Sequence, residues 1–219
     1  MSCPHMKSLR PELEPPPSRM QSLPMDDRGY PVPWFVDWID GKPEFRAMDL
    51  KKWIRAVKEK LCWTCGERLG RWMVFVAGPM CGINRTSSEP PSHLECARYA
   101  AKNCPFLNNP EAIRRVDDVI GADMSHVAGF ALTRNPGVTM LWTCNNYSVF
   151  RDQKNRPLLQ MGEPSSVEWY SRGKPATREE VLASIESGMP ALAAIAQQQD
   201  GAIAYLLECR QKFERHIPT

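Results

Sequence analysis

The chain has 219 residues, of which 42% are hydrophobic and 24% are charged, an ordinary composition for a globular protein with a sizeable core. No run of about 18 apolar residues is present, so we expect no membrane-spanning helix. The N-terminal residues lack the apolar centre of a signal peptide, and a cytoplasmic location is therefore expected. The net charge of +3 is too small to indicate nucleic-acid binding by itself.

The N-terminal part of the chain differs in composition from the rest. Residues 1–27 are rich in proline and poor in large apolar side chains, so we expect them to form a flexible tail. Residues 28–219 are expected to form a single α+β domain. Alternating apolar residues at 34–38 predict a short strand, and Asp40-Gly41 is a turn signal.

An amphipathic helix is predicted over residues 49–61. Its apolar residues recur every three or four positions, at Leu50, Trp53, Ile54, Val57 and Leu61. From Arg46 to Arg71 the chain has eight Lys or Arg residues and three acidic ones. Such a local excess of positive charge is typical of a solvated helix face, and it is also a weak indication of phosphate binding.

The C-terminal half is predicted to contain a sheet followed by helices. Four short β-rich segments, at 138–144, 147–150, 157–161 and 166–170, are separated by turn residues and predict an antiparallel meander. Thr177 and Glu180 form a capping box that opens a helix. Gly188 can end that helix, and Pro190 can begin the next.

The cysteines are concentrated in one region, since five of the eight lie between Cys62 and Cys104. In a reducing cytosol such cysteines are metal ligands or buried thiols more often than disulfides. A Cys-x-x-Cys pair such as Cys62 and Cys65 fits either a redox motif or a zinc site, but the redox motif belongs at the start of a helix. Here a predicted helix precedes the pair, and Gly66 and a strand follow it. This order favours a zinc knuckle.

A second pair of ligands has the complementary spacing. Ser92 and Glu95 fit a capping box that would start a helix at His93, running to about Asn103. His93 and Cys96 are three residues apart, so both side chains would leave the same face of its first turn. The helix N-terminus also favours a thiolate there.

A knuckle, a hairpin and a helix that donates two ligands resemble a treble-clef zinc finger over residues 62–104. We therefore predict that Zn²⁺ is bound by Cys62, Cys65, His93 and Cys96. Cys81 or Cys104 could replace His93, and an iron–sulfur cluster held by four cysteines is a less favoured alternative because no ferredoxin-like spacing is present. Cys144 and Cys209 are interpreted as buried thiols.

The chain as a whole is similar to uncharacterised proteins encoded by bacteria and their phages. The stretches that carry this similarity are "RGYPVPWFVDWIDGKPEFR", "FVAGPMCGINRTSSEPPSHLECARYAAKNCPFL" and "GKPATREEVLASIESGMPAL". The resemblance implies no particular activity. By association alone, it suggests a nucleic acid or a host protein as the partner.

These observations favour a non-enzymatic zinc protein that presents a basic surface to nucleic acid or to a protein, and we assign no catalytic residue. The candidate phosphate-contacting residues are Lys51, Lys52, Arg55, Lys58, Arg68, Arg71 and Arg85.

Two alternatives remain open. One is a metal-dependent nuclease of the ββα-metal type, although the histidine expected at the end of the hairpin strand is missing and only His126 remains for it. The other is a small-molecule pocket between the meander and the zinc unit, lined by Trp142, Trp169 and Tyr170.

Overall fold

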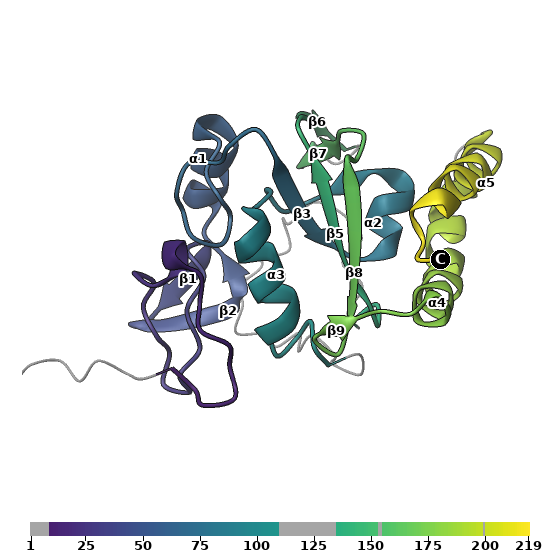
Figure 1. Cartoon of the computed structure of the whole chain (residues 1–219). Coiled ribbons are helices and arrows are strands. Elements are labelled where there is room, and N and C mark those ends of the chain that lie inside the picture. Colours follow the sequence, from purple (N-terminus) through teal and green to yellow (C-terminus); the bar gives the residue numbers. More distant parts are fainter. Residues whose placement is uncertain (1–8, 110–134, 153–154, 199) are drawn as a thin grey trace, which may run out of the picture.

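The computed structural model describes residues 9–109, 135–152, 155–198 and 200–219, which form a mixed α+β fold with antiparallel sheets and C-terminal helices (Figure 1). The strands are β1 (Val36–Ile39), β2 (Lys42–Met48), β3 (Met73–Ala77), β4 (Thr86–Ser87), β5 (Thr139–Cys144), β6 (Tyr147–Arg151), β7 (Pro157–Met161), β8 (Ser166–Ser171) and β9 (Lys174–Pro175). The helices are α1 (Leu50–Glu59), α2 (Pro79–Asn84), α3 (Leu94–Asn103), α4 (Arg178–Ala196) and α5 (Ala202–Phe213), with 3-10 turns η1 (Ser18–Met20) and η3 (Glu214–His216).

The largest sheet has the strand order β3-β5-β8-β9 and is antiparallel throughout. Helix α3 lies on one face of this sheet, whereas α2, α4 and α5 lie on the other (Figure 1). β5 is buried along its whole length, so it serves both faces. Met140 and Trp142 belong to the larger core cluster, with residues of α4 and α5, and Leu141 packs with Ala97 and Ala101 of α3.

The four predicted β-rich segments all form strands, but they do not form one meander. β5 and β8 pair directly in the large sheet, whereas β7 pairs with β6 on one side and with β4 on the other in a separate three-stranded sheet. The chain leaves the large sheet at Asn145-Asn146 and returns at Gly162, and the Gly162 amide donates to the Asn146 carbonyl over 3.0 Å. Asn145, Asn146 and Gly162 were predicted to be simple turn residues, but they form the base of an inserted hairpin.

Helix α1 forms where a helix was predicted, but the face that it buries is narrower than its apolar stripe. The Asp49 side chain caps it by accepting from the amides of Lys51 and Lys52. Trp53 is buried, whereas Leu50 and Ile54 are 62% and 53% exposed. Only one side of the helix packs on the domain, so the wide apolar stripe predicted from spacing is partly in water.

The C-terminal helices begin as predicted but divide elsewhere. The capping box of Thr177 and Glu180 is present at the start of α4. Helix α4 then continues through Gly188 and Pro190 to Ala196, and the break comes at Gly201, with φ +74°. Gly188 is needed for close packing instead, because a Cβ there would lie 2.8 Å from Met80 Cγ. None of the described helices has the length and apolar character needed to cross a bilayer.

Gly82 of α2 provides a test of this packing. A Cβ at Gly82 would lie 2.5 Å from Phe213 Cε2 and 2.8 Å from Met140 Sδ. We expect Gly82→Ala to lower the free energy of unfolding by about 1–3 kcal/mol, because overpacking outweighs the helix preference of alanine, which is about 1 kcal/mol. Gly70→Ala is the control, since no atom lies within 4 Å of a Cβ there. Equal unfolding midpoints for the two variants in urea would contradict the packing described here.

Candidate metal centre

The first two candidate ligands lie in a tight turn between α1 and β3. The Gly66 amide donates to the Cys62 carbonyl over 2.8 Å, and the Cys62 amide donates to the Glu67 carbonyl over 2.7 Å. The turn also directs the Cys65 amide at the Cys62 sulfur, 3.4 Å away. This arrangement places two sulfur atoms close together and supplies an N–H donor to one of them.

Gly66 is required in this turn for two separate reasons. Its φ is +79°, a conformation that residues with a Cβ rarely adopt. In addition, a Cβ at Gly66 would lie 2.7 Å from the Trp34 ring, which packs directly on the turn. The Trp34 amide donates to the Thr64 carbonyl over 2.7 Å, so the segment before β1 is bound to the turn by its backbone as well.

The other two candidate ligands lie at the start of α3. His93 is the N-cap residue, and Cys96 lies in the first turn. The predicted capping box of Ser92 and Glu95 does not form, because both side chains have other partners. Ser92 Oγ lies 2.9 Å from Thr64 Oγ1, and Glu95 accepts from Arg19.

Ser92 instead joins the start of α3 to the central sheet. Its backbone forms a bridge with Val74, in which the two residues exchange hydrogen bonds of 2.8 and 2.9 Å. The position of His93 therefore depends on β3 and on the knuckle, through the backbone and the side chain of Ser92 respectively.

The four side chains form a buried Cys3His group. Their ligand atoms, one from each residue, lie within 4.8 Å of one another. His93 Nδ1 lies 3.4 Å from Cys65 Sγ and 4.0 Å from Cys96 Sγ. In a tetrahedral zinc site with Zn–S bonds of about 2.3 Å and Zn–N bonds of about 2.0 Å, a ligating nitrogen and a ligating sulfur are separated by roughly 3.5 Å. The cluster thus has the size and the donor set of a zinc-binding site.

The imidazole of His93 is oriented by a backbone carbonyl. Its Nε2 lies 3.0 Å from the Arg68 carbonyl oxygen, to which it donates when it carries the proton. Nδ1 is then the nitrogen that faces the three sulfur atoms. A histidine ligand whose other nitrogen is held by a carbonyl is the usual arrangement at metal sites, because it fixes both the tautomer and the ring.

The electrostatics of the cluster favour a positive ion. Burial raises the pKa of the Cys62 thiol, but hydrogen bonds with Cys65, Cys96 and His93 outweigh burial and hold this pKa far below its usual value. Hydrogen bonds to Cys62 and Cys65 raise the pKa of His93 to about 10. A thiolate that holds a nearby imidazole in its protonated form is a site at which a metal cation can replace a proton.

The two cysteines that were alternatives to His93 lie outside this cluster. Cys81 is in α2, and burial raises the pKa of its thiol to about 11. Cys104 follows α3 as its C-cap residue, and burial raises its pKa as well. Because the fourth donor is an imidazole, the group matches the Cys3His set of structural zinc sites better than a four-cysteine iron–sulfur cluster.

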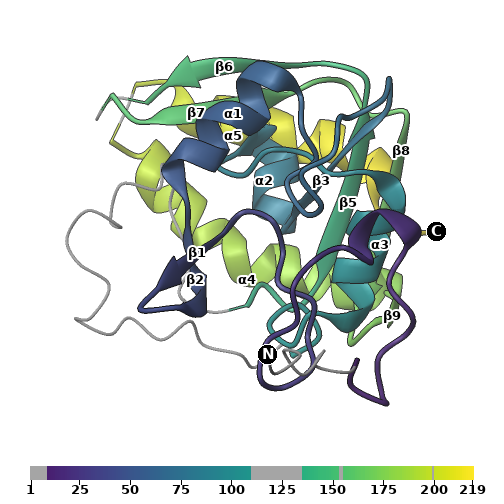
Figure 2. The same cartoon turned by 90° about the vertical axis from the view of Figure 1, so that its left-hand side faces the viewer.

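The N-terminal segment packs on the cluster, in contrast to the expected flexible tail. Met20 is only 3% exposed and shares a core cluster with Cys62, Cys65 and Cys96. Figure 2 shows this segment, in purple, beside α3. The segment is held by the burial of Met20, with Leu23 packed against the same cluster, and by the Glu14 amide, which donates to Asn103 Oδ1 over 3.1 Å. Residues 1–8 of the expected tail lie outside the described residues.

Arg19 connects this segment to both halves of the cluster. Its guanidinium contacts Glu67 Oε2 at 2.6 Å, beside the knuckle, and Glu95 Oε1 at 2.9 Å, in α3. These ion pairs are exposed, so each contributes little stability by itself. Their effect is to fix the direction in which the segment crosses the cluster.

The predicted phosphate-contacting residues fall into two sets. Lys51, Arg55 and Lys58 are exposed along α1, and Arg68 and Arg71 are exposed between the knuckle and β3. Lys52 and Arg55 also lie over the Trp34 ring, 5.9 and 5.7 Å from its centroid. The ring therefore separates the knuckle from the basic side of α1.

Arg85 does not join these residues. Its guanidinium donates to the Met161 carbonyl and forms an ion pair with Glu163, near the inserted hairpin. These contacts give Arg85 a structural role that does not require a phosphate.

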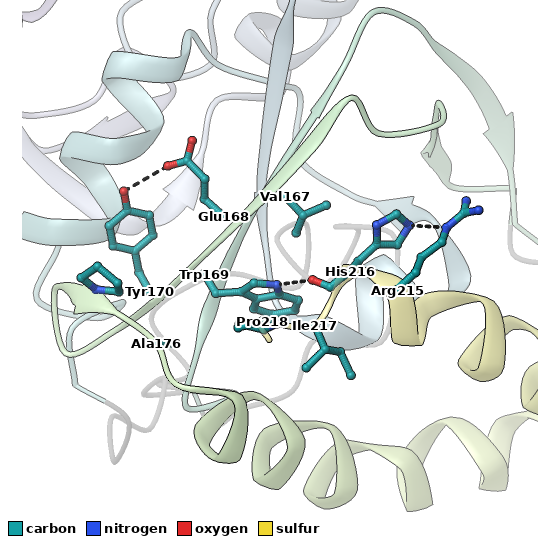
Figure 3. Close-up of a pocket in the computed structure, with 10 residues that line it drawn as sticks. Val167, Glu168, Trp169, Tyr170, Ala176, Arg215, His216, Ile217 and Pro218 are labelled. Carbon is teal, nitrogen blue, oxygen red and sulfur yellow. Dashed lines mark hydrogen bonds between the residues drawn. The ribbon is translucent and has the colours of Figure 1, made fainter.

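The residues considered for a small-molecule pocket only partly converge. Trp169 and Tyr170 line a groove of about 460 Å³ beside β8 (Figure 3). Trp142, in contrast, is buried in the core and stacks on Phe213. The opposite wall is formed by residues 215–218, not by the knuckle. Trp169 Nε1 donates to the His216 carbonyl, and Glu168 accepts from Tyr170, so these polar groups already have partners.

No protein-family model matches the chain, and neither the curated proteins nor the solved structures include one with significant similarity to it. The metal-binding character of the site is therefore inferred from the geometry of its four side chains alone.

Replacement of one ligand tests the metal centre directly. We expect the protein to hold one zinc ion per chain and Cys65→Ser to lose it, because three donors of a closed site bind much more weakly than four. Cys209→Ser, in α5, should retain the metal. Elemental analysis of both purified variants measures this, and full zinc occupancy in Cys65→Ser would show that the ligand assignment is wrong.

Zinc affinity should increase with pH. Because the pKa of His93 is raised to about 10 in the metal-free cluster, its imidazole is protonated at neutral pH and the metal must displace that proton. Competition with a coloured chelator between about pH 6 and 9 measures the affinity, and we expect it to rise up to about tenfold per pH unit for each proton released. An affinity that does not change with pH would contradict a thiolate–imidazole site.

Proposed function

We propose that this protein binds a structural zinc ion at Cys62, Cys65, His93 and Cys96, and that the metal holds a treble-clef-like unit. The observation that carries the proposal is the convergence of four buried donors from two local pairs, one in a glycine-containing turn and one in the first turn of α3. That order of turn and helix is the one expected for a treble clef. A closed set of four protein ligands leaves no coordination position for a substrate, which favours a structural role over catalysis at the metal.

The metal would join segments that share only a small apolar cluster around the four ligands. The cluster lies beside the N-terminal segment, below the Trp34 ring and at the start of α3. Its neighbours in the small core cluster are few, with Met20, Leu69, Met73 and Tyr99 as the buried residues besides the three cysteines. In such a unit the free energy of metal binding becomes free energy of folding, of order 10 kcal/mol in isolated zinc fingers.

We further propose that the surface around this unit binds nucleic acid. Between Asp49 and Trp72 there are seven basic and three acidic residues, an excess of four positive charges that exceeds the +3 of the whole chain. All three acids have basic partners within or beside the unit. Asp49 pairs with Lys52, Glu59 with Arg55, and Glu67 with Arg19. Lys51, Lys58, Arg68 and Arg71 are exposed on the same stretch, where phosphates can reach them.

A charge-reversal experiment tests this role. We expect binding to a DNA duplex to weaken steeply with added salt, as counterions are released. Lys51→Glu with Lys58→Glu should reduce the slope of log affinity against log salt by about two, one for each lost phosphate contact. Lys174→Glu with Lys212→Glu changes the net charge equally at two exposed positions, one in β9 and one in α5. This control should leave the slope unchanged.

The same assay separates the other functions. Binding that is absent at low salt would favour a protein partner for the basic surface. Cleavage of DNA on addition of Mg²⁺ or Mn²⁺ would instead favour the nuclease. Among the described residues, the Cys3His cluster is the one group of potential metal ligands found, and His126 lies outside them.

A further inference from the structure

Trp72 is an exposed aromatic residue in the segment between the Cys62–Cys65 turn and β3. It precedes β3 and is 47% exposed, although tryptophan is among the side chains that gain most from burial. The Arg71 guanidinium carbon lies 5.1 Å from the centroid of its ring. An indole held beside a guanidinium in water is an arrangement suited to stacking on a flat partner.

The backbone that carries Trp72 is held by the metal centre. Arg68, four residues before Trp72, forms a bridge with Leu61, and its carbonyl oxygen lies 3.0 Å from His93 Nε2. The Leu69 amide donates to the Lys60 carbonyl over 2.8 Å, which aligns the two arms of the turn. The exposed side chains of Lys60, Arg68 and Arg71 therefore extend from a braced segment next to the indole.

A second exposed tryptophan shows what is particular about this position. Trp38 in β1 is 43% exposed, nearly as much as Trp72. Its neighbours in sequence include Asp37 and Asp40, and Asp37 accepts a hydrogen bond from the Trp38 amide. A phosphate backbone would be repelled at Trp38 and attracted at Trp72, although the two rings are similarly accessible.

We propose that Trp72 stacks on an unpaired base and that this surface binds single-stranded nucleic acid in preference to duplex. The inference rests on the nucleic-acid binding proposed above and names the form of nucleic acid. In a duplex the faces of the bases are hidden, so only the cations would be used. In a single strand, Arg68 and Arg71 contact phosphates while the indole stacks on a base, a combination that recurs in proteins that bind single strands without sequence preference.

The experiment compares matched variants on matched probes at low salt. The probes are an oligothymidylate and an oligouridylate, each about 15 nucleotides long, and a DNA duplex of the same length. Trp72→Ala should weaken binding to the single strands by about tenfold and leave duplex binding within about twofold, because one stacked base is lost and no charge is changed. Trp38→Ala should bind all probes as the unaltered protein does. Zinc content and unfolding midpoint, measured for each variant, identify any loss that comes from folding.

Trp72→Phe gives a readout that a structural role would not change. Phenylalanine can still stack, so affinity for the single strands should stay within about threefold. The quenching of tryptophan fluorescence by the oligonucleotide should nevertheless fall sharply, whereas in Trp38→Phe it should persist.

The outcomes distinguish this inference from the function on which it rests. If the unaltered protein binds neither single strands nor duplex, both proposals fail. If it binds, but Trp72→Ala and Trp38→Ala behave alike, the basic surface stands and the stacking role is wrong. Equal losses on single strands and duplex would also overturn stacking. A difference between the thymidylate and uridylate probes that disappears in Trp72→Ala supports the inference, because the two probes differ in base and sugar and not in charge.

Discussion

The arrangement of this protein's N-terminal half depends on the convergence of three sulfur atoms and one imidazole nitrogen within 4.8 Å. Two of these donors come from a five-residue turn and two from the first turn of α3. Around them lie the N-terminal segment, the Trp34 ring and the braced arm that leads to β3. The main apolar core is much larger, since it includes residues of α4 and α5 and extends to Trp53 of α1 and to Trp63 within the turn. The small centre of polar ligands thus adjoins an extensive hydrophobic core.

Much of this centre could be predicted from the sequence because its determinants are local. The turn at Cys62 and Cys65 needs a glycine with positive φ, and Gly66 is in place. The spacing of His93 and Cys96 matches one helical turn. The capping role predicted for Ser92 was wrong because the prediction used local sequence alone. The backbone of Ser92 bridges Val74 and its hydroxyl contacts Thr64, and neither residue is near Ser92 in the sequence.

Long-range packing decided the features that were not predicted. The β-rich segments were recognised as strands, but nothing in their composition shows that β8 pairs with β5 across an inserted hairpin. Gly188 and Pro190 suggest a helix end, yet α4 continues through both, and Gly188 lies against Met80 of α2. The N-terminal segment is another case, since one methionine among prolines gives little periodic signal, and Met20 is buried against cysteines that are far away in the sequence. Composition reports the average character of a segment, whereas a single buried side chain can fix its position.

The bridge between Ser92 and Val74 also has a consequence for how the chain reaches this state. Cys62 and Cys65 can meet in a short turn before any tertiary structure exists, but His93 is 28 residues beyond Cys65 and is placed by β3. A metal ion bound first by Cys62 and Cys65 would therefore gain its other two ligands only after the sheet has formed. Once closed, the site acts as a crosslink across this loop, and crosslinks of that length destabilise the unfolded chain by about 3–4 kcal/mol through lost loop entropy. Part of the metal's contribution to stability would then come from the smaller number of conformations open to the unfolded chain. That part does not correspond to any contact in the folded structure.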